Sequence, residues 1–216
     1  MIDILIPTCK EYEQVQPLIN EINRHTLEPH RIFASCQPMS ASINRNLCHE
    51  NAQSDIIVSM DDDITGFYAG WLSQLVSMLR DNDNYIWVSA RYVDKNKQVI
   101  HQMHCGHSLD KPVTIASDDK CPSACIAYRK EMFDRVKKDK SLPNNKPYDE
   151  ALKGSGFEDD DICIILKRYY SDKVFAVNNE CRLIHTNEMK NQKGVNWELN
   201  KKHMYSKYPN HPRVWH

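Results

Sequence analysis

Strands and helices alternate through the first 60 residues of the chain, and this pattern limits the folds that are open to it. Short runs rich in apolar residues predict strands over 2–6, 31–35 and 55–60. Apolar residues at helical spacing predict helices over 11–25 and 40–53 between these strands. Two successive strand–helix–strand units favour a parallel, doubly wound sheet, whose ligands bind beyond the carboxyl ends of the strands.

The second of these helices has a clear start signal. We expect Ser40 or Ser42 to be its N-cap and Ile43 and Leu47 to face the core. The later part of the chain is less regular, although it continues the α/β pattern. It predicts helices over 70–80, 130–137, 158–169 and 196–207, strands over 85–93, 123–128, 173–178 and 181–186, a hairpin between 98–104 and 113–116, and a long functional or mobile loop over 137–156.

Length and charge set broad limits. A chain of 216 residues is the size of a single domain with a full core. A net charge of -1 gives no general attraction for nucleic acid or for a membrane surface. The N-terminus has an acid, Asp3, where a signal peptide needs basic residues, so we expect a cytoplasmic protein without a membrane span. The eight cysteines are scattered through predicted strands and helices, which suits reduced thiols without disulfides.

Three acids, Asp61, Asp62 and Asp63, follow directly on the strand predicted over 55–60. Adjacent carboxylates repel one another, and a bound cation offsets that repulsion. Oxygen ligands favour a hard ion such as Mg²⁺ or Mn²⁺, which would bring a phosphate-bearing substrate with it. The alternative is a solvated loop, in which acidic triplets are common.

A second group of possible metal ligands lies in the middle of the chain. His101, His104, Cys105 and His107 precede Cys121 and Cys125 at spacings that zinc sites tolerate. The simpler interpretation is a hairpin with exposed histidines and two small buried cysteines. We expect this simpler arrangement, and therefore no structural zinc.

An ordered set of motifs carries a resemblance to a known family. These are "IPTCKE" at 6–11, "SINRNL" at 42–47, "DIIVSMDDD" at 55–63, "GWLSQL" at 70–75 and "GFEDDDICIIL" at 156–166. In this order they resemble the GT-A glycosyltransferases, especially glycosyltransferase family 2, over about residues 2–188. The last motif also resembles the Gly-Glu-Asp-Asp-Asp motif of the β-1,4-galactosyltransferases. "CRLIH" at 181–185 is similar to the strand with which those enzymes add a histidine to the metal site.

The resemblance implies an α/β/α sandwich of the GT-A (Rossmann-like) type with a mainly parallel central sheet. It also implies an inverting transferase that uses Mn²⁺ or Mg²⁺ and a nucleotide-sugar, with a UDP-sugar expected. The loop after strand 31–35 lacks the Asp that family members often place there for the nucleotide base, so the identity of the base stays open.

Residue roles follow from the same resemblance. It implies that Asp63, Asp61 and His185 are metal ligands, that Asp159 is the general base, and that Glu158 and Asp160 bind the acceptor. It implies nucleotide-sugar contacts from Pro7, Thr8, Glu11, Arg45, Asp61 and Asp62, with Asn46 beside Arg45. Independently of the family, an acidic first turn also suits the positive end of a helix dipole, so the run Glu158–Asp161 has a structural explanation as well.

The motifs divide the expected domain into a nucleotide-binding half over 1–63, an acceptor and catalytic half over 64–188, and a basic, aromatic tail over 189–216. We expect the acceptor to be a glycan, and the basic, aromatic tail leaves a hydroxylated base in DNA as a further candidate. We expect the tail helix instead to pack one aromatic face on the domain. The rival functions are a nucleotidyltransferase, which normally has a Gly-rich or basic N-terminal loop, and a catalytically inactive GT-A module that only binds.

Overall fold

The computed structural model describes residues 1–100, 109–116, 120–186 and 195–211. Its helices are α1 (Tyr12–His25), α2 (Ala41–Asn51), α3 (Trp71–Arg80), α4 (Lys130–Val136), α5 (Glu158–Tyr169) and α6 (Val195–Lys207). Its strands are β1 (Ile2–Thr8), β2 (His30–Cys36), β3 (Ile56–Met60), β4 (Ile64–Thr65), β5 (Tyr85–Val93), β6 (Val113–Ile115), β7 (Cys125–Arg129) and β8 (Val174–His185).

The strands described form one mixed sheet in the order β2-β1-β3-β7-β5-β8-β4, with β6 added on β8. Strand β1 pairs in parallel with both β2 and β3, which confirms the two crossovers predicted from the sequence. Strand β5 pairs in parallel with β8, while β7 runs antiparallel to its neighbours β3 and β5. The core of the sheet is therefore mainly parallel, and the carboxyl ends of β1, β2 and β3 share one edge.

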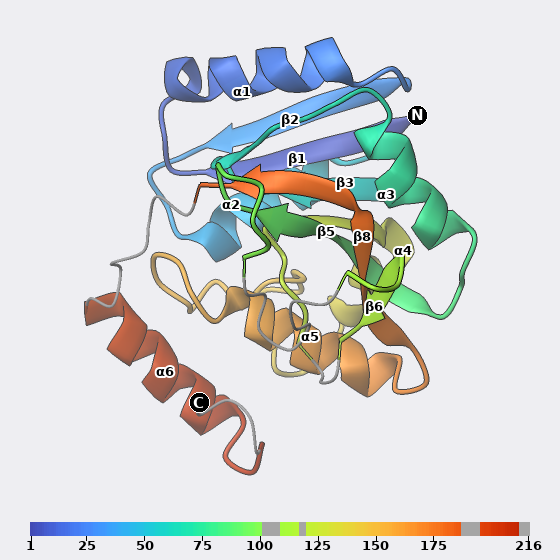
Figure 1. Cartoon of the computed structure of the whole chain (residues 1–216). Helices are drawn as coiled ribbons and strands as arrows, with labels where there is room; N and C mark the ends of the chain where they lie inside the picture. The colour runs from blue at the N-terminus through green and yellow to red at the C-terminus, as the bar shows by residue number, and fades with distance from the viewer. Residues whose placement is uncertain (101–108, 117–119, 187–194, 212–216) are drawn as a thin grey trace.

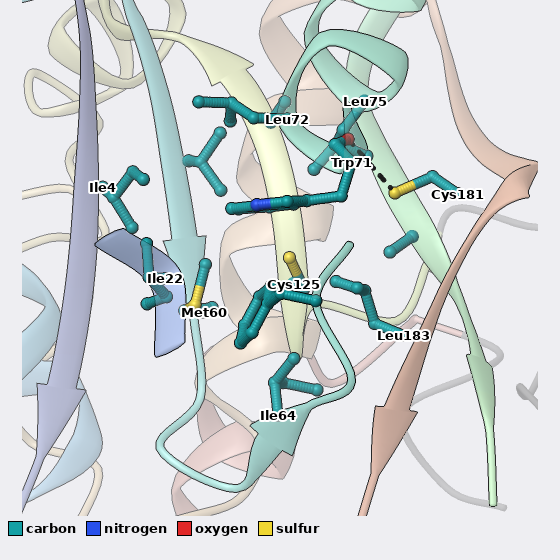
Figure 2. Packing of buried hydrophobic residues seen from close by; sticks show 14 of the residues in the cluster. Ile4, Ile22, Met60, Ile64, Trp71, Leu72, Leu75, Cys125, Cys181 and Leu183 are labelled. Carbon is teal, nitrogen blue, oxygen red and sulfur yellow. Dashed lines mark hydrogen bonds between the residues drawn. The ribbon is translucent and has the colours of Figure 1, made fainter. Parts of the chain in front are cut away.

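Helices cover both faces of this sheet (Figure 1). Side chains of α1 and α3 form one apolar cluster with the sheet, and those of α2, α4 and α5 form another. Trp71 at the start of α3 lies in the centre of the first cluster, among Ile4, Met60 and Leu183 (Figure 2). Its indole Nε1 donates to the hydroxyl of Thr26, 3.0 Å away, so its polar atom is satisfied inside the core. Helix α6 lies outside the layer formed by α5 (Figure 1).

Two later segments differ from the prediction. Strand β6 pairs with β8; of the segment 98–104 that was expected opposite it, residues 101–104 lie outside the described residues, and Val99 forms a bridge with Val93. The two strands expected over 173–178 and 181–186 form one bulged strand, β8. Its register against β5 jumps from Asn178 to Arg182, and the Asn178 side chain accepts the amide protons of Glu180 and Cys181. The polar residues that resembled a turn are therefore a bulge within one strand.

Helix α2 also differs from expectation. Ser40 is its N-cap, as predicted, but Ile43 and Leu47 are only half-buried. Its buried face is polar instead, and consists of Ser42, Asn44, Arg45, Asn46, Cys48 and His49. Asn46 donates to the carbonyl of Tyr148 and accepts the amide proton of the same residue, so it fixes the loop before α5 rather than facing the strand ends. The short segment directly after Asp63 forms strand β4.

His49 gives the fold a specific acid sensitivity. Its ring is fully buried between the hydroxyl of Tyr128, 3.1 Å away, and the carboxylate of Asp134, 3.0 Å away. Burial lowers the pKa of His49 to about 4, although the hydrogen bond to Asp134 opposes this shift. The unfolded chain therefore binds the proton more readily than the folded chain, so stability is present above the unfolded pKa of about 6.5 and is lost as the pH falls toward 4.

Between pH 7 and pH 5, His49 takes up a proton mainly in the unfolded chain. We expect this to lower the unfolding free energy by about 2 kcal/mol. Urea denaturation at the two pH values measures this difference. In His49→Gln the difference between the two values should shrink by that amount, whereas His25→Gln, on the outer helix α1, should keep the wild-type difference. An unchanged difference in His49→Gln would contradict the assignment.

Candidate active site

The acidic turn after β3 lies at the edge where the parallel strands end. The amide of Asp61 donates to the carbonyl of Ala124 at 2.8 Å, which fixes the start of the turn. Strand β4 then pairs antiparallel with the end of β8, so that Ile64 lies opposite His185. The amide of Thr186 donates to the carbonyl of Asp63 at 3.1 Å. Residues more than a hundred positions apart in the chain are thereby held side by side by backbone pairing.

Asp61, Asp63 and His185 form the candidate metal group. One ligand atom from each lies within 4.8 Å of the others, and the Nε2 atom of His185 is 3.2 Å from Oδ1 of Asp63. The structure thus brings together the three residues that the sequence indicated. Two carboxylates and one imidazole fit a divalent ion such as Mn²⁺, for which carboxylate oxygen and imidazole nitrogen are both ordinary ligands. This group could hold a metal ion.

Asp62 points the other way, toward the end of β1. It accepts a hydrogen bond from the hydroxyl of Thr8, and its other oxygen is 3.0 Å from the Nζ atom of Lys10. Thr8 also accepts the amide proton of Lys10 at 3.0 Å. Asp62 therefore ties the loop after β1 to the acidic turn. Cys9 lies between its two partners and is the one exposed thiol among the described cysteines.

The other residues expected at the nucleotide lie on either side of this loop. Pro7 is the penultimate residue of strand β1, and Glu11 is the N-cap of α1. Glu11 and Gln14 form a capping box, so Glu11 has a structural role at the start of the helix. Lys10 was not singled out from the sequence, and its place beside Asp62 is visible only in the structure.

Arg45 lies beneath the site and contacts acids from both halves of it. Its guanidinium is 2.8 Å from Asp61, 3.7 Å from Asp159 and 3.9 Å from Glu158, and its side chain is 4% exposed. The guanidinium also lies 5.9 Å from the ring centre of Tyr148. A cation this deeply buried is stable only because several carboxylates surround it. The pKa of Arg45 is held well above its usual value by Asp61, Asp159 and Glu158, against the effect of burial.

The acids at the start of α5 have different partners. Glu158 is 7% exposed, and its Oε2 atom accepts the amide proton of Gly156 at 2.7 Å. Asp159 is 40% exposed, and within the described part of the chain its buried Oδ1 atom accepts no hydrogen bond. Asp160 forms an ion pair with Lys120 at 2.9 Å. Asp161 is buried and accepts a hydrogen bond from Tyr208 at 2.6 Å. Of these four acids, Glu158 and Asp159 contact Arg45.

The turn that leads into these acids is strained. Phe157 is the N-cap of α5 and has a left-handed backbone, with φ of 72°. This conformation costs roughly 1–2 kcal/mol for a residue other than glycine. Gly154 and Gly156 on its N-terminal side also have positive φ. Such strain often marks a position where the direction of the following side chains matters.

Crowding of the carboxylates shifts their proton affinities. The pKa of Asp61 is raised to about 6, first by burial and then by the charges of Asp159 and Asp63, although Arg45 opposes the shift. The pKa of Glu158 is raised to about 7, first by burial and then by the charge of Asp159. Arg45 alone therefore does not offset the negative charge gathered here, and a divalent cation at Asp61 and Asp63 would offset more of it.

The alternative zinc group is not assembled by the residues described. His101, His104, Cys105 and His107 lie outside the described residues. Cys121 and Cys125 are buried, and the thiol of Cys121 lies 3.8 Å from the carbonyl of Ala176. The seven cysteines that are described carry free thiols. Among the described residues no helix has the length and apolar character that a membrane crossing requires.

No protein-family model matches the chain, and no curated protein sequence does. Several solved structures, in contrast, superpose on the chain. GalNAc-T7 with UDP, GalNAc and Mn²⁺ superposes with a TM-score of 0.64 at 9% identity, over 96% of this chain and 47% of that one. Glucosyl-3-phosphoglycerate synthase from Mycobacterium tuberculosis, in complex with phosphoglyceric acid, has a TM-score of 0.57 at 14% identity, over 96% of this chain and 79% of that one. The chain has a GT-A fold.

A third structure with this arrangement, A197 from STIV, covers 87% of the chain at 11% identity, with a TM-score of 0.50. All three identities are low, so the comparisons show the fold alone. The chain spans less than half the length of GalNAc-T7. In this chain, the acidic turn after β3 lies beside the end of β8, at the edge of the sheet where β1 and β3 end. The α/β/α arrangement expected from the sequence is confirmed.

Proposed function

We propose that this GT-A chain is a metal-dependent, inverting glycosyltransferase that moves a sugar from a nucleotide-sugar, expected to be a UDP-sugar, to a hydroxyl group. One observation carries the proposal: Asp61, Asp63 and His185 gather within 4.8 Å, and Arg45 links Asp61 to Asp159 and Glu158. This arrangement provides a place for a cation with a diphosphate next to a carboxylate that can take a proton.

The chain's own residues would divide the work as follows. Asp61, Asp63 and His185 hold the ion, which supplies positive charge to the departing diphosphate when bound. The acceptor oxygen attacks the anomeric carbon, the bond from that carbon to the diphosphate oxygen breaks, and Asp159 takes the hydroxyl proton. A single in-line displacement of this kind inverts the anomeric configuration. Asp159 is 40% exposed, whereas Glu158 is 7% exposed, and this greater exposure supports Asp159 as the base over Glu158.

The two halves of the domain would bind the two substrates. Residues 1–63 would bind the nucleotide through the loop at Pro7, Thr8 and Glu11, whereas residues 64–188 would bind the acceptor through Glu158 and Asp160. Asp160 already pairs with Lys120, so an acceptor would meet this pair rather than a lone carboxylate. The proposed acceptor is a glycan, with a hydroxylated DNA base as the other hydroxyl-bearing candidate.

A donor screen tests the proposal directly. Purified protein is incubated with several nucleotide-sugars, with and without Mn²⁺, and release of the nucleoside diphosphate is followed over time. We expect release with a UDP-sugar only when Mn²⁺ is present, and faster release with an acceptor. Mn²⁺-dependent binding of UDP without any release or transfer would instead support a binding module. Release of pyrophosphate from a nucleoside triphosphate would support a nucleotidyltransferase.

A further inference from the structure

Helix α6 holds the strained turn that precedes the candidate base. Asn200, which is buried in α6, accepts the amide proton of Lys153 and donates to the carbonyl of the same residue, each at 2.8 Å. It also donates to the carbonyl of Gly156 at 3.1 Å. One side chain thus satisfies three backbone groups of a loop that has no helix or strand of its own.

Trp197, one turn earlier in α6, packs on the same turn. Its ring centre is 4.4 Å from that of Phe157, the residue with the left-handed backbone. A Cβ atom on Gly156 would lie 3.1 Å from the Trp197 ring, so a side chain there would require the ring to shift. The indole therefore covers both residues that precede Glu158.

Buried charges fix α6 in this place. The Nζ atom of Lys207 is 2.7 Å from Asp149 and 2.8 Å from Asp161, and His203 is 2.9 Å from Asp149. Met204 and Tyr208 are buried in a small apolar cluster with Leu152, Phe157 and Ile164. Asp161, the fourth acid of the run, therefore serves to attach α6 and does not face the metal group. The carbonyl of Gly154, in the same turn, accepts the amide proton of Ala41 at the start of α2.

We propose that α6 is a positioning element for catalysis: Asn200 and Trp197 hold residues 153–157 in the one conformation that directs Glu158 and Asp159 toward Arg45 and Asp61. The catalytic part of this inference rests on the proposed function, whereas the conformational part does not. Helix α6 contributes no group to the metal site, because Asp61, Asp63 and His185 come from the turn after β3 and from β8. Loosening the turn should therefore misplace the base and leave the metal group intact.

The test compares Asn200→Ala with Asn200→Asp, Trp197→Ala, Trp197→Phe and the control Leu199→Ala. Asn200→Asp keeps the acceptor for the Lys153 amide and loses the two donated bonds, so its effect should be intermediate. Trp197→Phe keeps a ring on Phe157 and should restore most of what Trp197→Ala loses. Leu199 is 50% exposed on α6, so Leu199→Ala should behave as wild type. Trp197 is itself only partly buried, which makes Trp197→Ala the variant to use if Asn200→Ala does not fold.

Two readouts separate the parts of the inference. Hydrogen exchange of the amides over 156–161 should become faster by about tenfold or more in Asn200→Ala and Trp197→Ala. In the same variants, kcat for sugar transfer should fall by up to about 100-fold with the KM for donor and the affinity for Mn²⁺ kept, because a small displacement of a catalytic group has that cost.

Unchanged exchange in both alanine variants would overturn the inference, whether or not the wild type transfers sugar. Faster exchange with kcat unchanged would overturn the catalytic part. Parallel loss of Mn²⁺ affinity and kcat would show that α6 only stabilises the fold. If the wild type shows no transfer with any donor, the proposed function fails, and the exchange readout still decides whether α6 holds the turn.

Discussion

Replacing Asp159 by asparagine should lower kcat for sugar transfer by about 10²–10⁴-fold, the range typical of a lost acid–base group. Asparagine keeps the shape of the side chain but cannot accept the acceptor proton. The metal group lies on other elements, so UDP and Mn²⁺ should still bind. Steady-state kinetics with saturating donor, together with calorimetry of UDP binding, measures both expectations.

Glu158→Gln is the matched comparison for this result. The raised pKa of Glu158, about 7, allows this carboxylate to exchange a proton near neutral pH. Glu158 is nevertheless buried and accepts the amide proton of Gly156, so we expect its replacement to act mainly on the KM for acceptor. If Glu158→Gln abolishes turnover and Asp159→Asn does not, the proton goes to Glu158 instead.

Replacing Asp63 or His185 by alanine should weaken Mn²⁺ binding by about 100-fold or more. Loss of a group that merely orients a metal ligand already costs about 10–100-fold, and these residues would be the ligands themselves. Because the cation would link the protein to the diphosphate, UDP affinity should fall with it. Titration of the protein with Mn²⁺ alone, and then with UDP at saturating Mn²⁺, measures the two effects separately.

Asp62→Asn is the control for the metal variants. Asp62 is adjacent to both proposed ligands in sequence, yet its carboxylate bonds Thr8 and Lys10. Its replacement should therefore leave Mn²⁺ affinity close to that of the wild type. UDP binding of equal strength with Mn²⁺ and with a chelator would contradict the metal site altogether.

Local patterns predicted most of the first half of the fold. Strands β1, β2 and β3 and helix α1 are each specified by a continuous run of residues, and each was expected within two residues of its observed bounds. One pairing that the sequence did not predict is set by distant residues. Nothing near Val113 indicates that β6 pairs with β8, some sixty residues later, rather than with the preceding segment.

The site was predictable to a different degree for each residue. Asp61 and Asp63 could be proposed as metal ligands from the sequence pattern itself, because they directly follow a buried strand. His185 was proposed as a ligand only through the family resemblance. The place of Arg45 beneath the acids could not be read from the sequence. A helix that buries Asn44, Arg45, Asn46 and His49 has no apolar stripe there, and hydrophobic periodicity therefore pointed to Ile43 and Leu47. The consecutive polar residues Asn44, Arg45 and Asn46 within α2 were the available signal.

The cysteines at the strand ends give experimenters a means of observing this edge of the molecule. Among the described cysteines, Cys48, Cys121, Cys125, Cys163 and Cys181 are buried, Cys36 is partly buried and Cys9 is exposed. A thiol-reactive fluorophore used in limiting amount should therefore label Cys9 before these other cysteines. Cys9 lies between Thr8 and Lys10, both of which contact Asp62, so an attached dye would sit at the rim of the acidic turn. Its emission would then report ligand arrival in real time, without a coupled assay or a known acceptor.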